Sequence, residues 1–66
     1  MEILINGETR QVQDACTVAQ LLDSLSLTGK RLAFEVNMEI VPRGDYAGHR
    51  LAEGDRVEIV HAIGGG

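Results

Sequence analysis

The chain has 66 residues, the size of one small domain, and its 44% hydrophobic and 24% charged residues are the composition of a folded protein. The net charge is −4, the 6 basic residues are spread along the chain, and there is one Phe and one Tyr, so we expect no nucleic-acid binding. A single cysteine excludes an internal disulfide and favours a cytoplasmic location, and the apolar run at the N-terminus is too short for a signal peptide or a membrane span.

A β-hairpin is the first element that the sequence predicts. Residues 1–5 have the two-residue period of a strand, with Ile3 and Ile5 on one face. Asn6-Gly7 follows, and both residue types tolerate the positive φ angles of a tight two-residue turn. Residues 8–12 then form the returning strand of an antiparallel pair.

An amphipathic helix is predicted to follow Thr17. Thr17 and Gln20 have the spacing of a capping box, in which each side chain bonds to the backbone N–H of the other residue. Apolar residues recur at i, i+3, i+4 and i+7 and therefore share one face. They are Val18, Leu21, Leu22 and Leu25. We expect the helix to end near Ser26, with Gly29 in the loop that follows.

The second half of the chain predicts three further strands. Residues 32–36 alternate in the same way, and a tight turn leads into a short strand at Ile40-Val41, which Pro42 ends. A single helical turn is expected over residues 45–48. After a Gly-Asp turn, residues 56–61 form the last strand. Its inward-facing residues are Val57 and Ile59.

The order of these elements, β-β-α-β-β-β, indicates the α+β class and the β-grasp, or ubiquitin-like, arrangement. In this fold the first and last strands lie parallel in the middle of a mixed sheet of four to five strands, and the helix packs across one face. We expect the domain to span residues 1–61. Residues 62–66 would form a flexible C-terminal glycine tail.

The chain ends in Ala62-Ile63-Gly64-Gly65-Gly66. Glycine loses the most backbone entropy on ordering and has no side chain to pack, so such a run adds nothing to a core. It does provide a thin thread with the α-carboxylate of Gly66 at its tip, and five extended residues reach roughly 15 Å. That geometry suits a carboxylate that enters the active site of another protein. The alternative is a frayed end or a cloning remnant.

Four segments of the sequence resemble a known family. They are Met1-Glu2-Ile3-Leu4-Ile5-Asn6-Gly7, Thr17-Val18-x-x-Leu21-Leu22, Val36-Asn37-x-x-Ile40-Val41-Pro42-Arg43, and Gly54-Asp55-x-Val57-x-Ile59 through to Gly65-Gly66. The third segment, the short length and the glycine end are the specific features, because many β-grasp proteins share the others. On these residues the chain resembles, over its whole length, the ThiS family of sulfur carriers of thiamin biosynthesis.

The resemblance implies a protein cosubstrate and not an enzyme, with no catalytic residue, metal or cofactor of its own. A ThiF-type adenylyltransferase would use ATP and Mg²⁺ to convert the Gly66 carboxylate into an acyl-adenylate. Sulfur from a persulfide donor would displace AMP and leave a thiocarboxylate, which a ThiG-type thiazole synthase would receive. Ile63, Gly64 and Gly65 are the tail residues expected to lie in the partner's active site.

A docking surface for these partners is expected on the face of the sheet away from the helix. Leu4 and Val60 are out of phase with their inward-facing neighbours, and adjacent central strands would place them together as an exposed apolar patch. His61 lies at the end of the last strand, near the tail. The alternative is that scattered apolar residues are normal on a surface. We expect the free carrier to be a monomer.

Three other residue types carry weaker hypotheses. Cys16 adjoins the helix N-cap, where a thiolate is favoured, but a lone cysteine is more often a small buried hydrophobic residue. His49 and His61 match no metal-ligand or acid–base spacing. Arg43 could pair with acidic neighbours or contact a partner, and the sequence does not decide between these roles.

Four other functions stay open on the sequence. The small subunit of molybdopterin synthase would use the same fold, tail and activation chemistry but deliver sulfur to a pterin precursor. A ubiquitin-like modifier would end in an isopeptide bond to lysine. A plain interaction module would not need the tail, and a small enzyme would depend on Cys16.

Overall fold

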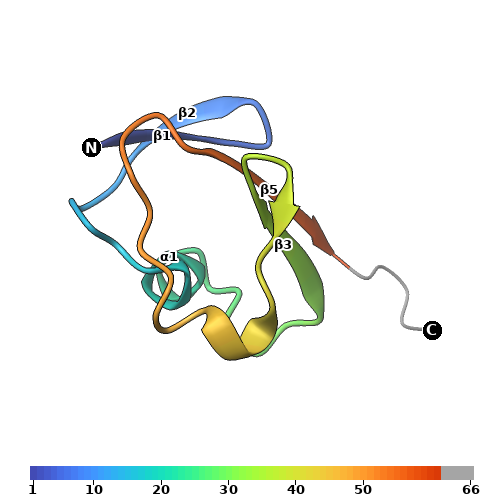
Figure 1. The fold of residues 1–66 in the computed structure, drawn as a ribbon. Coiled ribbons are helices and arrows are strands. Elements are labelled where there is room, and N and C mark those ends of the chain that lie inside the picture. Colours follow the sequence, from blue (N-terminus) through green and yellow to red (C-terminus); the bar gives the residue numbers. More distant parts are fainter. Residues whose placement is uncertain (62–66) are drawn as a thin grey trace.

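Five strands form a single sheet in the computed structural model, which describes residues 1–61. The strands are β1 (Glu2–Ile5), β2 (Glu8–Gln11), β3 (Leu32–Val36), β4 (Glu39–Ile40) and β5 (Arg56–His61). Helix α1 (Val18–Ser24) lies across one face, and a short 3₁₀ helix, η1 (Arg43–Asp45), lies between β4 and β5 (Figure 1). The predicted tail, residues 62–66, lies outside the described residues.

The order across the sheet is β2-β1-β5-β3-β4, with β1 and β5 parallel at its centre. Leu4 lies opposite Arg56 and Ile5 lies opposite Val57. β2 is antiparallel to β1, β3 is antiparallel to β5, and β4 completes the sheet beside β3. This mixed sheet with one helix confirms the predicted β-grasp arrangement.

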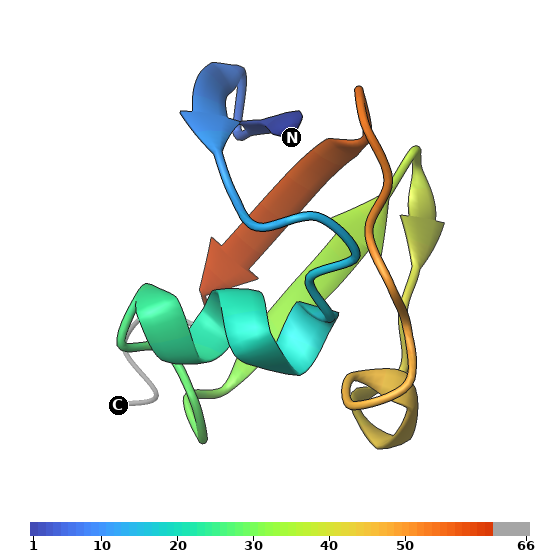
Figure 2. The same ribbon diagram turned by 90° about the vertical axis from the view of Figure 1, so that its left-hand side faces the viewer.

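The hydrophobic core lies between α1 and the face of the sheet that the helix covers (Figure 2). Because side chains alternate along a strand, β1, β3 and β5 each turn one large residue fully inward. These are Ile3 (0% exposed), Phe34 (0%) and Val57 (1%), which pack with Val18 and Leu21 of the helix. Among residues 1–61 no helix is long and apolar enough to cross a membrane.

Helix α1 begins as predicted and ends earlier than predicted. The Thr17 hydroxyl accepts from the Gln20 N–H at 3.1 Å, and Gln20 Oε1 accepts from the Thr17 N–H at 2.9 Å, which completes the capping box. The helix stops at Ser24 because Ser26 adopts a left-handed conformation, with φ of 60°. The Leu27 N–H then bonds back to the Leu22 carbonyl at 2.8 Å, the closing bond of a Schellman motif.

Two boundaries after β3 also differ from the prediction. The turn contains only Asn37 and Met38, so β4 is Glu39–Ile40 and not Ile40-Val41. Val41 follows the strand: its side chain is buried, and its N–H still donates to the Phe34 carbonyl of β3 at 2.8 Å. The helical turn predicted over residues 45–48 is present, because the Gly48 and His49 N–H groups donate to the Asp45 carbonyl at 3.1 and 2.9 Å, but helical structure begins earlier than predicted. The 3₁₀ helix η1 begins directly after Pro42, whose φ of −63° suits the entry into a helical turn.

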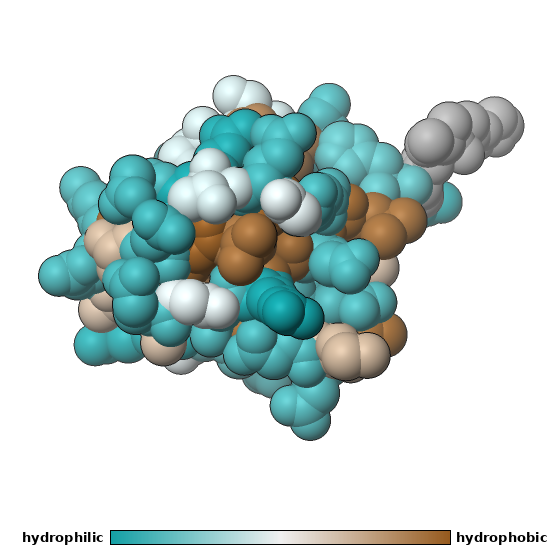
Figure 3. Space-filling view, turned by 90° about the horizontal axis from the view of Figure 1, so that it is seen from above, coloured by the Kyte–Doolittle hydropathy of each residue, from teal (hydrophilic) through white to brown (hydrophobic). Residues whose placement is uncertain are grey.

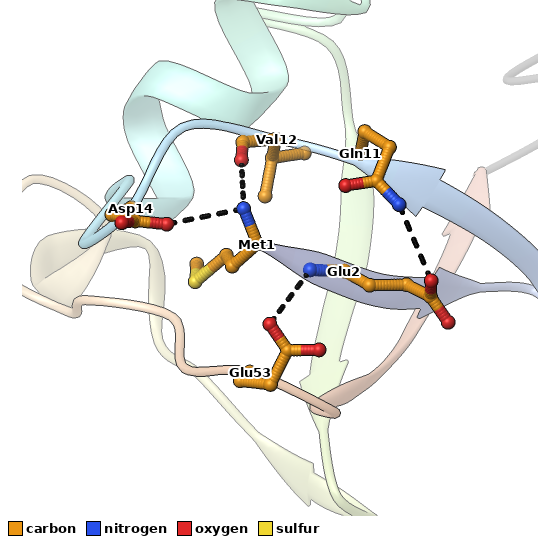
Figure 4. Close-up of polar contacts among 6 residues, drawn as sticks. All are labelled: Met1, Glu2, Gln11, Val12, Asp14 and Glu53. Carbon is orange, nitrogen blue, oxygen red and sulfur yellow. Dashed lines mark hydrogen bonds and ion pairs between the residues drawn. The ribbon is translucent and has the colours of Figure 1, made fainter.

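Polar contacts tie the start of β1 to two loops (Figure 4). The amine of Met1 donates to the Val12 carbonyl oxygen at 2.7 Å and to Asp14 Oδ1 at 3.1 Å. The Glu2 N–H donates to Glu53 Oε1 at 3.0 Å. The loop that precedes β5 is therefore held against β1, which supports the parallel register of the two central strands.

The left-handed Ser26 generates a prediction on stability. Only glycine adopts this conformation without steric strain, so Ser26→Gly should stabilise the domain by roughly 0.5–1 kcal/mol and raise its Tm by a few degrees. Thermal denaturation measures the change. Ser24→Gly, inside the last helical turn, is the control and should lower the Tm. A Tm that falls in Ser26→Gly would contradict the assignment of this helix end.

Candidate functional site

The face of the sheet away from α1 has no element packed over it in the described part of the chain (Figure 1). Leu4 and Val60 both reach this face, because each alternates with a buried neighbour on its strand. Together with His61 they line one groove along the β1–β5 seam, with a volume of about 690 Å³. The structure thus brings together the three residues that were predicted to form the docking surface, and their docking role stays a prediction.

The groove has apolar and polar parts. Val60 is 58% exposed, Leu4 is partly buried and His61 is exposed. The other lining residues are Asn6, Gly7, Arg56, Val57, Glu58 and Ile59. Figure 3, which looks at the molecule from the side of β1 and β2, shows apolar atoms at the surface among hydrophilic residues. An exposed β-branched side chain in such a setting is typical of a contact surface.

Two carboxylates lie opposite each other on the same open face. Glu35 of β3 is the cross-strand partner of Glu58 of β5, and the next pair on the same face is Ala33 with Val60. Like charges directly opposite on a sheet are destabilising. The acidic pair therefore borders the apolar groove without a benefit to the fold, and it favours a partner that presents a basic group. This pair was not among the predicted site residues, although the strand period alone puts Glu35 and Glu58 on the outer face.

The exposed apolar surface extends along the same face beyond the groove. Ile40 of β4 is the cross-strand partner of Glu35 and is 68% exposed. Met38, at the β3–β4 turn, is 88% exposed. Ile40 was predicted only as part of a short strand, and the structure adds that its side chain is exposed on this face.

The groove ends at His61, the last residue that the structure describes. Ile63, Gly64, Gly65 and Gly66 lie outside the described residues, so their predicted role in a partner's active site stays a prediction. His61 is joined to them through Ala62 by the chain itself. The predicted docking surface therefore adjoins the point where the predicted tail begins.

Cys16 belongs to the core. It is 8% exposed, its thiol donates to the Thr17 carbonyl at 3.3 Å, and burial raises its pKa. A raised pKa reduces the thiolate fraction, which is the reactive form. The structure thus favours the hypothesis of a small buried hydrophobic residue over that of a nucleophile.

The other polar candidates lie apart from one another. His49 lines a hollow beside Asp45, whereas His61 lines the β1–β5 groove. Within residues 1–61 no group of three His, Cys, Asp or Glu side chains is placed to hold a metal ion. Arg43 begins η1 and lines a small hollow beside Lys30 and Tyr46. Its role is not decided by these contacts.

Three comparisons with known proteins agree with this geometry. The sequence profile of the ThiS family matches residues 3–66. The chain is 35% identical over 66 residues to the sulfur carrier protein ThiS of Escherichia coli, with 100% of both chains covered. A crystal structure of thiamine biosynthesis protein ThiS from Geobacter metallireducens superposes with a TM-score of 0.82 at 29% identity, again over 100% of both chains.

A longer relative gives a second kind of match. The chain is 44% identical over its full 66 residues to a thiazole synthase of Paramagnetospirillum magneticum, but it spans only 20% of the length of that protein. The profile match, the full-length relative and the common fold lead to one conclusion. The chain belongs to the ThiS family.

Proposed function

We propose that this protein is a sulfur carrier for the formation of the thiazole of thiamin, and that the carboxylate of Gly66 is the group that carries sulfur. The observation that carries the proposal is the match to the Escherichia coli sulfur carrier over 100% of both chains. The glycine run at residues 64–66 supports it, because a thread without Cβ atoms fits a narrow active site.

The chemistry begins at a poor electrophile. An adenylyltransferase of the ThiF type joins the Gly66 carboxylate to the α-phosphate of ATP, with Mg²⁺ at the phosphates, and pyrophosphate leaves. The terminal sulfur of a persulfide attacks the acyl carbon and AMP leaves, which forms an acyl disulfide. A thiol then attacks the disulfide and leaves the thiocarboxylate on Gly66. The thiocarboxylate is an anionic sulfur nucleophile, as thiolates are.

The acceptor in this proposal is a thiazole synthase. The thiazole synthase of Paramagnetospirillum magneticum contains a stretch that matches this entire chain, which supports a functional link between the two kinds of domain. The protein itself acts as a cosubstrate: the domain docks and the tail reaches the partner's catalytic site. The single cysteine fits a reducing compartment, so we place this activity in the cytoplasm.

The proposal predicts a change in intact mass. Incubation with ATP, Mg²⁺, a ThiF-type activating enzyme and a persulfide donor should increase the mass by the difference between one sulfur and one oxygen. A variant that lacks Gly65 and Gly66 should fold normally and show no increase. Sulfide with a reductant in place of the persulfide should give the same product.

The result that would contradict the carrier function is an unchanged mass while a known ThiS carrier is converted in parallel. A covalent adduct to lysines of other proteins would instead indicate a ubiquitin-like modifier. Transfer of the sulfur to a pterin precursor, and not to a thiazole, would indicate the molybdopterin branch of the same chemistry.

A second prediction concerns the docking groove. Val60→Gln should weaken binding to the activating enzyme roughly tenfold, because it removes an exposed apolar contact without disturbing the core. Met38→Gln is the matched control: Met38 is also exposed and apolar, but it does not line the groove. Isothermal titration measures both affinities. Equal losses in the two variants would contradict a docking role for the groove.

A third prediction separates a carrier from a small thiol enzyme. Cys16→Ala should leave the rate of thiocarboxylate formation within about twofold of the unsubstituted protein, because the thiol is buried and its pKa is raised. It should also lower the free energy of unfolding by about 1 kcal/mol through lost packing. Abolished activity in a folded Cys16→Ala protein would contradict the carrier chemistry proposed here.

A further inference from the structure

Both two-residue hairpin turns begin with an asparagine that contacts β5. Asn6 precedes Gly7 and Asn37 precedes Met38, with φ angles of 49° and 52°. The Asn6 carboxamide forms hydrogen bonds with the backbone of Ile59 in β5. The Asn37 carboxamide bonds to the Arg56 N–H at the start of β5 and to the side chain of Asp55, the residue before the strand. The two asparagines act at different ends of the strand.

Asn37 holds the beginning of β5. Its Oδ1 accepts from the Arg56 N–H at 3.0 Å, and its Nδ2 donates to Asp55 Oδ1 at 3.1 Å. The backbone N–H of Asn37 also donates to the Arg56 carbonyl at 2.7 Å. These contacts close the β3–β4 turn against the start of the strand, at the end remote from His61.

Asn6 holds β5 where the backbone of β1 no longer reaches it. The last backbone bond from the β1 side is the Asn6 N–H to the Val57 carbonyl, at 2.8 Å. The side chain then takes over: Oδ1 accepts from the Ile59 N–H at 2.9 Å, and Nδ2 donates to the Ile59 carbonyl at 3.2 Å. A carboxamide carries the same donor and acceptor as a peptide group, so it substitutes for one further residue of β1.

This contact lies two residues before the end of β5. Backbone groups alternate sides along a strand, so Ile59 and His61 turn theirs to the side of β1. On the other side Val60 and His61 are opposite Ala33 and Leu32 of β3. Among the described residues, the Asn6 carboxamide is the only group that bonds the backbone of β5 from the β1 side beyond Val57.

We propose that Asn6 is a positioning residue for sulfur loading, because it holds the end of β5 from the second side and so fixes the place and direction in which the chain leaves the domain after His61. This inference rests on the proposed carrier function. The same residue lines the β1–β5 groove, so a domain docked there would present its tail from a constant point. Reactions between bound groups are sensitive to displacements of about 1 Å, which can lower a rate roughly a hundredfold.

The test compares Asn6→Gly with Asn37→Gly. Glycine accepts the positive φ of either turn, so each variant keeps its turn and loses only the carboxamide contacts. The two changes remove the same group from the same turn position, and we expect similar losses of Tm. Amide hydrogen exchange should accelerate at Ile59 in Asn6→Gly and at Arg56 in Asn37→Gly.

The functional readout is steady-state adenylation by a ThiF-type activating enzyme, followed as pyrophosphate release against carrier concentration. Asn6→Gly should lower kcat between roughly tenfold and a hundredfold and leave KM within about twofold, because docking is retained and the tail is misplaced. Asn37→Gly should leave both constants within about twofold. Asn6→Asp, which keeps the acceptor for the Ile59 N–H and loses the donor, should fall between Asn6→Gly and the unsubstituted protein.

Three results would overturn the inference. Equal loss of kcat in Asn6→Gly and Asn37→Gly would show a general effect of stability. A raised KM with unchanged kcat would make Asn6 a docking contact. If the unsubstituted protein is not adenylated, the carrier function and the inference are both wrong. If the unsubstituted protein is adenylated normally and only the variants differ from expectation, the inference alone is wrong. If Asn6→Gly does not fold, Asn6→Asp decides: a lowered kcat with KM within about twofold of the unsubstituted protein supports the inference, and an unchanged kcat overturns it.

Discussion

The parallel pairing of β1 with β5 is the contact on which the other parts of the structure depend. It joins residues that are more than fifty positions apart, such as Asn6 and Ile59. Closing so long a loop costs conformational entropy, and this cost is offset only when most of the chain has folded around the pair. The two antiparallel partners, β2 and β3, attach to the outer edges of this pair. Without the pair, the chain would have two separate hairpins, and the core residues Ile3 and Val57 would have no common face.

The short length of the chain explains why one face of the sheet stays open. A chain of 66 residues has one α-helix of 7 residues in its described part, and this helix can cover only one side of five strands. The fold therefore leaves Leu4, Val60 and the carboxylates of Glu35 and Glu58 on a surface that contributes little to its stability. Residues on such a surface are free to be selected for binding, because their loss does not unfold the domain.

Much of the fold could be predicted from periodicity and turn chemistry. The capping box at Thr17, the Asn6-Gly7 turn and the inward side chains of β5 each follow from local rules, and they agree with one another. The differences between the predicted and observed elements lie at their ends, where the backbone conformation of a single residue decides the boundary. Ser26 ends the helix in a left-handed conformation that glycine usually adopts, so the sequence located the helix end only to within two residues, whereas Gly29 lies in the following loop as predicted.

The candidate site shows the complementary limit of sequence reasoning. The shared face of Leu4 and Val60 could be predicted, because strand phase and strand order suffice for it. The opposition of Glu35 and Glu58 needs the register of β3 against β5, and the contact of Asn6 with Ile59 needs the exact end of β1. Register and side-chain contacts across more than twenty residues are set by tertiary packing, and no local pattern in the sequence encodes them.

A carrier that visits two partners needs an interface that releases as well as binds. In the proposed function the domain must leave the adenylyltransferase before it meets the synthase, so the free energy of docking has to stay moderate. The open face is suited to this requirement: as a docking surface, a half-buried Leu4 and an exposed Val60 would supply a small apolar contact. Glu35 and Glu58 would supply charge that steers a basic partner and is weakened by salt. Specificity can then reside in the tail, whose entry into a narrow site adds contacts only with the correct enzyme. A larger apolar patch would tighten both complexes and slow the exchange between them.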